Sequence, residues 1–199
     1  MVVVNYSHLM VLNLLHKSLS ITFILLLTNT FMNPTANPNY RVISDHVIAE
    51  VRRKLENQQN SLFALRSYQP GETIAAFSAG TISAEPTYLT VQVGIRKHIT
   101  LQPEFLQYIN HSCDPNVFFD TSLMQLVALK EVKKGEEMTF FYPSTEWKMI
   151  QRFQCYCGSP FCLGEIRGAA YLSKDAQEKY RLTDFIQQQL AKRAARKVA

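Results

Sequence analysis

Acidic residues are missing from the first 44 positions of this 199-residue chain. An apolar run in that segment, Leu19–Leu27, follows Lys17 and resembles a signal peptide or a short anchor. The run is well below the length of about 20 apolar residues that a helix needs to cross a bilayer. We therefore expect no stable membrane association.

Residues 1–39 are interpreted as an N-terminal extension. No small-x-small cleavage site follows the apolar run, and Met32 offers a second start codon. The favoured interpretation is that translation begins at Met32 and that the upstream residues come from the gene prediction. If residues 1–31 are translated, an organelle-targeting segment is the alternative, although the stretch is poor in arginine. Residues 33–39 consist of turn-forming residues and are typical of a linker.

The overall charge is only mildly positive. Lysine and arginine number 21 and acidic residues 16, which gives a net charge of +5. This excess permits an acidic partner without demanding one, so no direct nucleic-acid contact is required. The basic end of the chain, residues 192–197, is interpreted as the solvated end of a helix, with a nuclear-import patch as the alternative. The hydrophobic content of 47% is typical of one globular domain with extensions.

The four cysteines of the chain form one informative pattern. Cys113 lies in the segment Asn-His-Ser-Cys-Asp-Pro-Asn, and the other three form a C-x-C-x4-C cluster at Cys155, Cys157 and Cys162. Two disulfides are the alternative, but a C-x-C pair is too close to bond internally and such spacing is typical of metal sites. Four thiolates suit a tetrahedral structural zinc site. Zinc thiolates persist best in a reducing compartment, which favours the nucleus or cytoplasm.

Short β-like runs separated by turns dominate the rest of the sequence. The runs are Leu62–Leu65, Thr73–Ser78, Tyr88–Val93, Leu126–Lys130 and Met138–Tyr142. Helical spacing of apolar residues predicts a short amphipathic helix over 45–57, and residues 187–197 predict a C-terminal helix. The absence of a βαβ alternation argues against a doubly wound parallel sheet. The fold class expected is mostly β, with small antiparallel sheets and short helices.

Three motifs occur in a fixed order: NHSCDPN at 110–116, GEEMTFFY at 135–142 and CYCGSPFC at 155–162. In this order and spacing they resemble the SET-domain protein lysine methyltransferases that carry a post-SET zinc segment, over roughly residues 60–168. The resemblance implies a SET domain over 40–150 with a pseudoknot, a zinc-stapled post-SET segment over 151–168 and a helical tail over 169–199. It also implies a role as a chromatin regulator if the substrate is a histone.

The implied activity is methylation of a lysine in a histone tail or in another protein, with S-adenosyl-L-methionine as the methyl donor. The attacking amine must be neutral, and an apolar channel favours that form. By resemblance, Tyr142 and Tyr88 are the channel tyrosines, and Tyr88 is expected on a strand. Phe140 occupies the position that sets how many methyl groups fit. Because phenylalanine lacks a hydroxyl group there, we expect di- or trimethylation.

The resemblance assigns the cofactor and metal sites as well. S-adenosylmethionine is expected to contact six residues: Asn110, His111, Ser61, Leu62, Phe63 and Tyr142. Zinc is expected on Cys113, Cys155, Cys157 and Cys162. Because Cys113 adjoins the cofactor segment whereas the other ligands lie in the tail, the metal is expected to clamp the tail over the active site.

Two departures from the family pattern stand out. SET domains usually carry a Gly-x-Gly segment before the first strand, where glycine allows close backbone approach to the cofactor. Here the matching stretch, 58–61, reads Gln-Gln-Asn-Ser, and Phe141 stands where an aspartate is common. The missing glycines favour an alternative function, a catalytically silent, zinc-stabilised protein-binding module. The sequence does not determine the oligomeric state.

Overall fold

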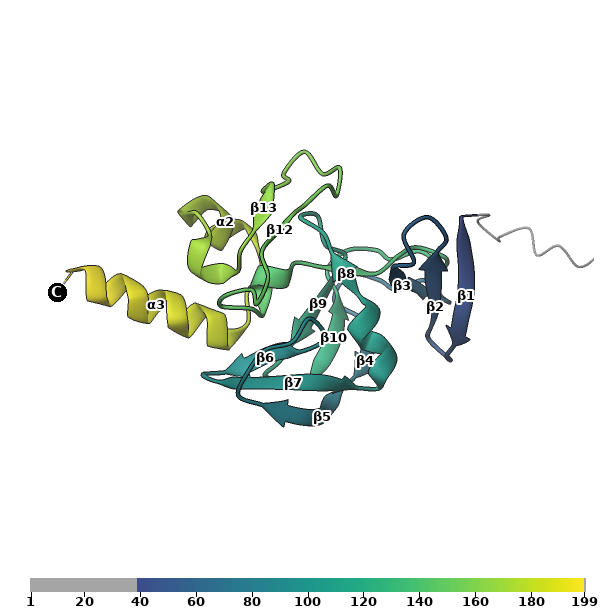
Figure 1. The fold of residues 1–199 in the computed structure, drawn as a ribbon, viewed down its shortest axis with the longest axis horizontal. Helices are drawn as coiled ribbons and strands as arrows, with labels where there is room; N and C mark the ends of the chain where they lie inside the picture. Colours follow the sequence, from purple (N-terminus) through teal and green to yellow (C-terminus); the bar gives the residue numbers. More distant parts are fainter. Residues whose placement is uncertain (1–38, 199) are drawn as a thin grey trace, which may run out of the picture. The chain divides into compact units, whose positions relative to one another are not determined.

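The computed structural model describes residues 39–198, and the predictions for residues 1–38 lie outside this range. The described part forms one unit. It consists of small sheets and short helices, as predicted (Figure 1). Among these residues no helix has the length and hydropathy needed to cross a membrane.

The first sheet corrects the prediction of a helix over 45–57. Strands β1 (Tyr40–Asp45), β2 (Ala49–Lys54) and β3 (Asn60–Ala64) pair antiparallel in chain order. Ala49 and Val51 are fully buried, whereas Val47 is 97% exposed in the turn before β2. Alternate residues of β2 therefore face the core, which is the period of a strand rather than a helix.

Two further sheets form the body of the domain. One has the order β4 (Thr73–Ala76), β10 (Gln125–Ala128) and β9 (Val117–Asp120), and the other has the order β5 (Ser78–Ser83), β7 (Lys97–Gln102) and β6 (Val91–Gly94). All their pairings are antiparallel. The 3-10 helix η2 (Glu104–Tyr108) leads from β7 toward the next strand.

A parallel pair of two-residue strands lies beside these sheets. Strand β8 (Asn110–His111) pairs with β11 (Thr139–Phe140). On its other side, the segment around β11 bonds to β3, because Met138 N–H donates to the Leu62 carbonyl (2.8 Å) and Ala64 N–H to the Glu136 carbonyl (2.9 Å). The GEEMTFFY segment is thus held between β3 and the NHSC segment.

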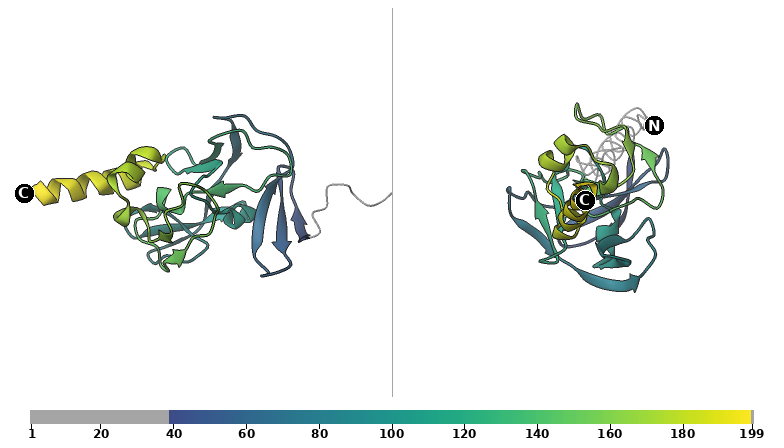
Figure 2. Two further views of the ribbon diagram at one scale, coloured as in Figure 1. Left: turned by 90° about the horizontal axis from the view of Figure 1, so that it is seen from above. Right: turned by 90° about the vertical axis from the view of Figure 1, so that its left-hand side faces the viewer.

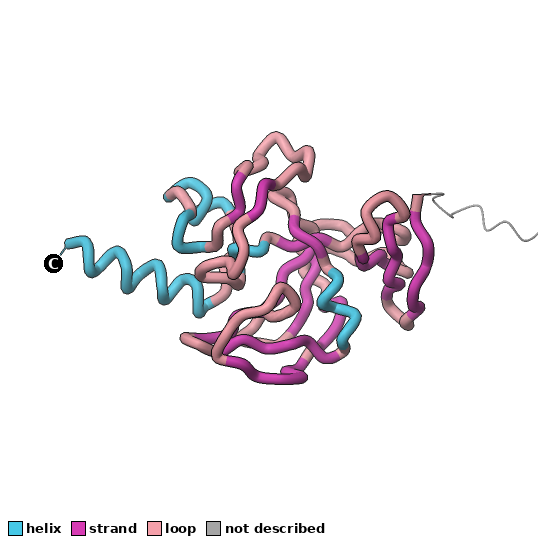
Figure 3. Tube along the Cα trace, viewed as in Figure 1, coloured by secondary structure: helices cyan, strands magenta, loops and turns pink. Residues whose placement is uncertain are grey.

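The C-terminal third contains the remaining short elements. The 3-10 helix η3 (Tyr142–Ser144) is followed by the antiparallel pair β12 (Phe153–Gln154) and β13 (Glu165–Ile166). Then come η4 (Ala169–Tyr171), α2 (Lys174–Lys179) and α3 (Asp184–Val198). Helix α3 confirms the predicted C-terminal helix. In Figure 1 and in the left view of Figure 2 it lies at the opposite end of the described unit from the β1–β3 sheet, and α2 lies toward the same end (Figure 3).

Buried side chains form three clusters. The largest joins all three-stranded sheets, and it includes the fully buried rings of Tyr68 and Phe119. A second cluster packs α2 and α3 against Phe141. This contact accounts for the phenylalanine at the position where the family commonly has aspartate: the Phe141 ring stacks on Tyr180 at 3.8 Å between centroids. The third cluster surrounds the cysteines.

Candidate functional site

A cavity of about 1190 Å³ lies where the β3, β8 and η3 segments meet. It is larger than most small-molecule pockets, so it has room for a ligand and part of a second one. Its wall combines residues that are far apart in sequence: Gln58–Asn60, Pro86–Val91, Leu101, Leu106–Asn110, Phe119, Phe140, Tyr142, Glu146, Met149–Gln151 and Phe153. Of the eight predicted site residues outside the cysteines, Tyr88, Asn110, Phe140 and Tyr142 line this one cavity.

Tyr142 stands at the start of η3 rather than at the end of a strand, because Pro143 directly follows it and begins a 3-10 turn. Its ring packs against Phe140 (4.7 Å between centroids) and His111 (5.1 Å). Burial raises the pKa of the Tyr142 phenol to about 12, with a smaller contribution from the charge of Glu137. The hydroxyl group is therefore protonated at neutral pH and can donate a hydrogen bond into the cavity.

Phe140 and Tyr88 occupy opposite environments. Phe140 is 8% exposed, and its ring lies between those of Phe119 (4.9 Å) and Tyr142. Tyr88 is 86% exposed, and it lies in a turn instead of on the predicted strand. The turn forms because the Thr87 and Thr90 hydroxyl groups bond to nearby backbone, which competes with strand pairing. Tyr88 therefore lies at the mouth of the cavity.

Asn110 ties the cavity wall together. Its amide nitrogen lies 2.9 Å from the Asn60 carbonyl, 2.8 Å from Ser61 Oγ and 3.1 Å from Glu137 Oε1. Its amide oxygen accepts a hydrogen bond from Gln59 Nε2 at 3.1 Å. This side chain therefore joins the NHSC segment to β3.

His111 connects the tyrosine to the cysteines. Its Nδ1 accepts a hydrogen bond from the Tyr142 backbone N–H (3.2 Å), so the ring proton resides on Nε2, which lies 3.3 Å from Cys113 Sγ. Burial lowers the pKa of His111 to about 4, and the ring is neutral at physiological pH. The imidazole itself is not part of the described lining of the cavity. Its role is to hold the backbone of Tyr142 in place through this hydrogen bond.

Three other predicted cofactor contacts, Ser61, Leu62 and Phe63, also lie behind the described lining. All three are buried on β3. Ser61 bonds to Asn110, Leu62 is part of the main core, and Phe63 packs against Tyr40 at 5.2 Å between ring centroids. Their neighbours Gln58, Gln59 and Asn60 provide the cavity surface instead.

The four cysteines meet at one point. Their sulfur atoms all lie within 4.8 Å of one another, and none forms a disulfide. A tetrahedral ion with Zn–S bonds of about 2.3 Å separates its sulfurs by about 3.8 Å, so the cluster can hold such a metal ion. Tyr180 of the tail donates a hydrogen bond from its hydroxyl to the Cys113 carbonyl (2.7 Å). The tail and the NHSC segment are therefore joined even apart from the metal.

Two residues of the site were missed in the sequence. Asn116 was given no role in the site, but it is 3% exposed, its amide nitrogen donates to the Glu137 carbonyl (2.8 Å) and its amide oxygen accepts from Thr139 N–H (2.7 Å). Glu146 gave no motif signal, yet it is a buried carboxylate in the cavity wall. Its position depends on long-range packing, which a single sequence does not display.

The sequence of this chain is similar to those of known proteins. The family model for the SET domain matches residues 79–143. Methyltransferase flvH of Aspergillus flavus is 37% identical over 123 residues, which cover 61% of this chain and 68% of that protein. The H3 lysine-36-specific histone-lysine N-methyltransferases of Schizosaccharomyces pombe and Saccharomyces cerevisiae are each 31% identical, over 46% and 41% of this chain. This chain spans only 12% of each of those two proteins.

The matched SET region contains Asn110, His111, Phe140 and Tyr142, the residues around which the cavity is built. The alignment with flvH extends the likeness to about two thirds of that protein. The chain therefore belongs to the SET-domain family.

Proposed function

We propose that this protein is an S-adenosylmethionine-dependent protein-lysine N-methyltransferase. The observation that carries the proposal is the shared cavity: Asn110, a predicted cofactor contact, and the aromatic pair Phe140 and Tyr142 line the same space. A methyl transfer between two bound molecules requires that both enter one site and meet in it. The histone-lysine methyltransferases among the relatives support the same chemistry.

S-adenosylmethionine would supply an activated methyl group on a sulfonium ion. Its volume fits the cavity together with the end of a lysine side chain, and Gln59, Asn60 and Asn110 provide polar groups for it. The chain itself would orient the amine through the protonated Tyr142 hydroxyl group. The rings of Phe119 and Phe140 would exclude water and favour the neutral amine.

The product is proposed to be di- or trimethyllysine. Phe140 lines the cavity beside Tyr142, at a position where a tyrosine would add a hydroxyl group. Without that group, a methylated amine is free to rotate and accept a second methyl. The variant Phe140→Tyr should shift the product toward monomethyllysine, measured by mass spectrometry. Strict monomethylation by the unmodified enzyme would contradict the assignment.

The four cysteines are proposed to hold zinc. A set of four thiolates forms a closed structural site for that ion. The substrate is proposed to be a lysine in a histone tail or in another protein, and the enzyme to act in the nucleus or cytoplasm. The matched histone-specific relatives favour a histone, but they share only a small part of their length with this chain.

The test uses the full chain loaded with zinc and methyl-labelled S-adenosylmethionine, with core histones in one reaction and cell lysate in another. Mass spectrometry would identify labelled lysines. The variant Tyr142→Phe should reduce kcat about 100-fold or more, because it removes one hydrogen-bond donor at the reacting centre. The matched control is Tyr156→Phe, since Tyr156 is 87% exposed between two cysteines and its hydroxyl faces solvent.

A second function, the catalytically silent binding module, is favoured by one observation. The stretch that replaces Gly-x-Gly carries long side chains into the cavity, and Gln58 has φ +60°, the backbone region that glycine adopts most easily. Calorimetry with S-adenosylmethionine discriminates the two functions. Saturable binding supports the enzyme, whereas folded, zinc-loaded protein that does not bind it would support the silent module.

A further inference from the structure

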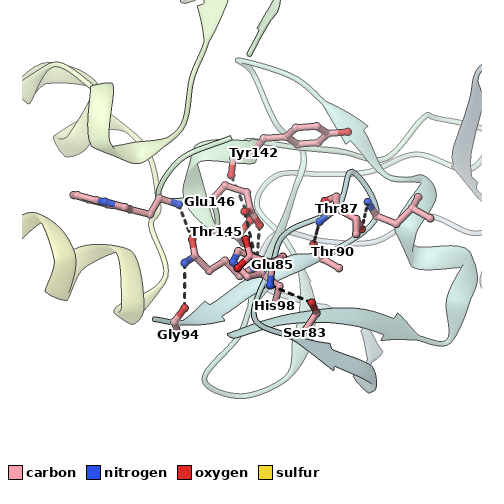
Figure 4. A network of polar contacts seen from close by, with 12 residues as sticks. Ser83, Glu85, Thr87, Thr90, Gly94, His98, Tyr142, Thr145 and Glu146 are labelled. Atoms are coloured by element: carbon pink, nitrogen blue, oxygen red, sulfur yellow. Dashed lines mark hydrogen bonds and ion pairs between the residues drawn. The ribbon is translucent and has the colours of Figure 1, made fainter. Parts of the chain in front are cut away.

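A buried acid–histidine pair lies between the main cavity and a second one. Glu146, two residues after the end of η3, is 8% exposed and lines the main cavity. His98 on β7 is 5% exposed and lines a separate cavity of about 320 Å³. Figure 4 shows the Glu146 side chain between Tyr142 and His98. Glu146 Oε2 lies 3.9 Å from His98 Nδ1, so the pair connects the two spaces.

Hydrogen bonds hold both the side chain and the backbone of Glu146 in place. Its Oε1 accepts a hydrogen bond from the Gln92 backbone N–H at 2.8 Å, and the Gln92 side chain accepts one from Trp147 N–H at 2.9 Å. The Glu146 carbonyl also accepts a hydrogen bond from Ala169 N–H of the tail. These contacts occupy one carboxylate oxygen and leave Oε2 facing His98.

His98 Nδ1 is buried and has no hydrogen-bond partner. Buried polar atoms are nearly always satisfied, so an orphaned ring nitrogen requires an explanation. A proton shared with the carboxyl group of Glu146 would satisfy both atoms after a small approach. In that arrangement the neutral His98 accepts from a protonated Glu146, or a protonated His98 donates to the carboxylate.

We propose that Glu146 accepts the proton that the substrate ammonium group must lose and passes it through His98 to the second cavity. The proposal rests on the lysine methylation proposed above. In the first step an N–H bond of the ammonium breaks, its electron pair stays on nitrogen, and the proton bonds to a carboxylate oxygen. In the second step that proton moves to His98 Nδ1 and the ring becomes an imidazolium. The imidazolium then releases one proton to solvent, which makes the ring neutral again.

The electrostatics favour the first step, from the amine to Glu146. Burial raises the pKa of Glu146 to about 7, although the bond from Gln92 lowers it. Burial in the same cavity lowers the pKa of a lysine amine, so the two pKa values move toward each other. Burial also lowers the pKa of His98, against the charge of Glu85. A neutral His98 is the form that can accept a proton.

Other titratable and charged side chains of the described structure lie in the two cavities that flank the pair. Tyr88 and Tyr142 line the main cavity near Glu146. On the far side, the second cavity is lined by Glu85, Arg96 and Lys148 beside His98. Because Glu146 must be ionised to accept a proton, methylation should weaken as the pH falls below about 7, the pKa of that group.

The first test is Glu146→Gln in the zinc-loaded full chain. Glutamine keeps the size and the acceptor for Gln92 N–H but cannot take a proton. We expect kcat to fall about 100-fold with KM within about threefold, and the acidic limb near pH 7 to disappear from the kcat profile. Glu146→Asp should restore part of the activity and the limb. The matched control is Glu178→Gln, an exposed acid on α2.

His98→Phe tests the exit route. It replaces the ring by an apolar one of similar shape, and we expect kcat to fall about tenfold because Glu146 then loses its path to solvent. Full activity of this variant would overturn the role of His98. Full activity of Glu146→Gln with an unchanged pH profile would overturn the role of Glu146, and a Glu146→Gln protein that has lost its fold would assign the residue to structure.

A second readout does not depend on activity. Carbon-13 NMR of glutamate carboxyl groups, assigned by comparison with Glu146→Gln, reports the titration of Glu146 directly. We expect a midpoint near pH 7 that shifts by about one unit in His98→Phe. A midpoint near the ordinary value of about 4.3 would overturn the proposal. If the unmodified protein titrates as expected but methylates no lysine, the proposed function fails while the coupled pair stands.

Discussion

The two sides of the cavity are built by different means. On one side, Asn110 and His111 are fixed by side-chain bonds, by pairing with β11 and by the adjoining cysteine cluster. On the other side, Gln58–Asn60 form a turn and strand end that backbone bonds hold to β2. The first side depends on particular side chains at particular spacing. The second depends mainly on backbone geometry, which many sequences satisfy.

The difference explains why the motifs lie where they do. Amide bridges and the proposed metal ligands tolerate few substitutions. The side formed by Asn110, His111 and the four cysteines, here called the cysteine side, therefore carries a pattern that the sequence displays. A β-turn with backbone hydrogen bonds tolerates a change from glycine to glutamine at a modest energetic cost. The absence of Gly-x-Gly therefore changes the surface of the cavity without removing the strand that supports it.

The largest expected effect follows from breaking the cysteine side. Removal of zinc with a chelator, or the variant Cys155→Ser, should release the tail segment that brings Met149 and Phe153 to the cavity. Because structural zinc contributes directly to folding, we expect Tm to fall by about 10–20 °C. Cofactor affinity and activity should fall together. The measurements are metal content, thermal unfolding and calorimetric titration with S-adenosylmethionine.

Tyr156→Ala is the control for the zinc experiment, because it alters the same loop and keeps all four thiols. It should retain the metal, the Tm and the affinity. If the cofactor still binds with undiminished affinity after zinc loss has been verified, the cysteine side does not depend on the metal for its shape.

A smaller effect should come from Asn116, which joins the cysteine side to the GEEMTFFY segment. The variant Asn116→Ala leaves Thr139 N–H and the Glu137 carbonyl without these partners in a buried place. We expect a loss of about 2–3 kcal/mol in the free energy of unfolding and a fall in Tm of about 5–10 °C, measured by denaturation.

Asp114→Ala is the matched control for Asn116→Ala. Asp114 belongs to the same turn, but its carboxylate pairs with Lys130 at the surface, and exposed pairs contribute less than about 1 kcal/mol. Equal effects of the two variants would show that the segment acts as a simple turn. A much larger effect of Asn116→Ala would show that its amide joins two strands.

The sequence predicted the mostly-β class, the cysteine cluster and the C-terminal helix. The resemblance to the family also pointed to four residues that line the cavity, namely Tyr88, Asn110, Phe140 and Tyr142. It failed over 45–57, where Val47, Val51 and Leu55 satisfy helical spacing by chance while β2 follows a period of two. It also missed Glu146, since nothing local distinguishes a buried carboxylate that packs against β6 and β7 from an exposed one.

The smallest expected effect comes from removing backbone strain on the side of the cavity formed by Gln58–Asn60. Gln58 has φ +60°, which costs a residue with a side chain about 1–2 kcal/mol relative to the ordinary helical region. Gln58→Gly removes this strain, although glycine gains entropy in the unfolded chain and the bond to the Leu55 carbonyl is lost. We expect a net gain of about 0.5–1 kcal/mol and a rise in Tm of about 2–4 °C, measured by thermal unfolding.

Arg96→Gly is the control for Gln58→Gly, because Arg96 also has a positive φ. It separates an effect on stability from an effect on cofactor affinity. Arg96 has φ +49° in the turn between β6 and β7, outside the main cavity, so its replacement should raise Tm without changing S-adenosylmethionine affinity. Gln58→Gly should raise both, with affinity improving several-fold, because a long side chain leaves the cavity wall. If the two variants raise Tm alike and neither alters the affinity, the glutamine side chain does not obstruct the cofactor. The glycines that the family carries would then be dispensable for binding in this chain, and the cysteine side alone would determine cofactor affinity.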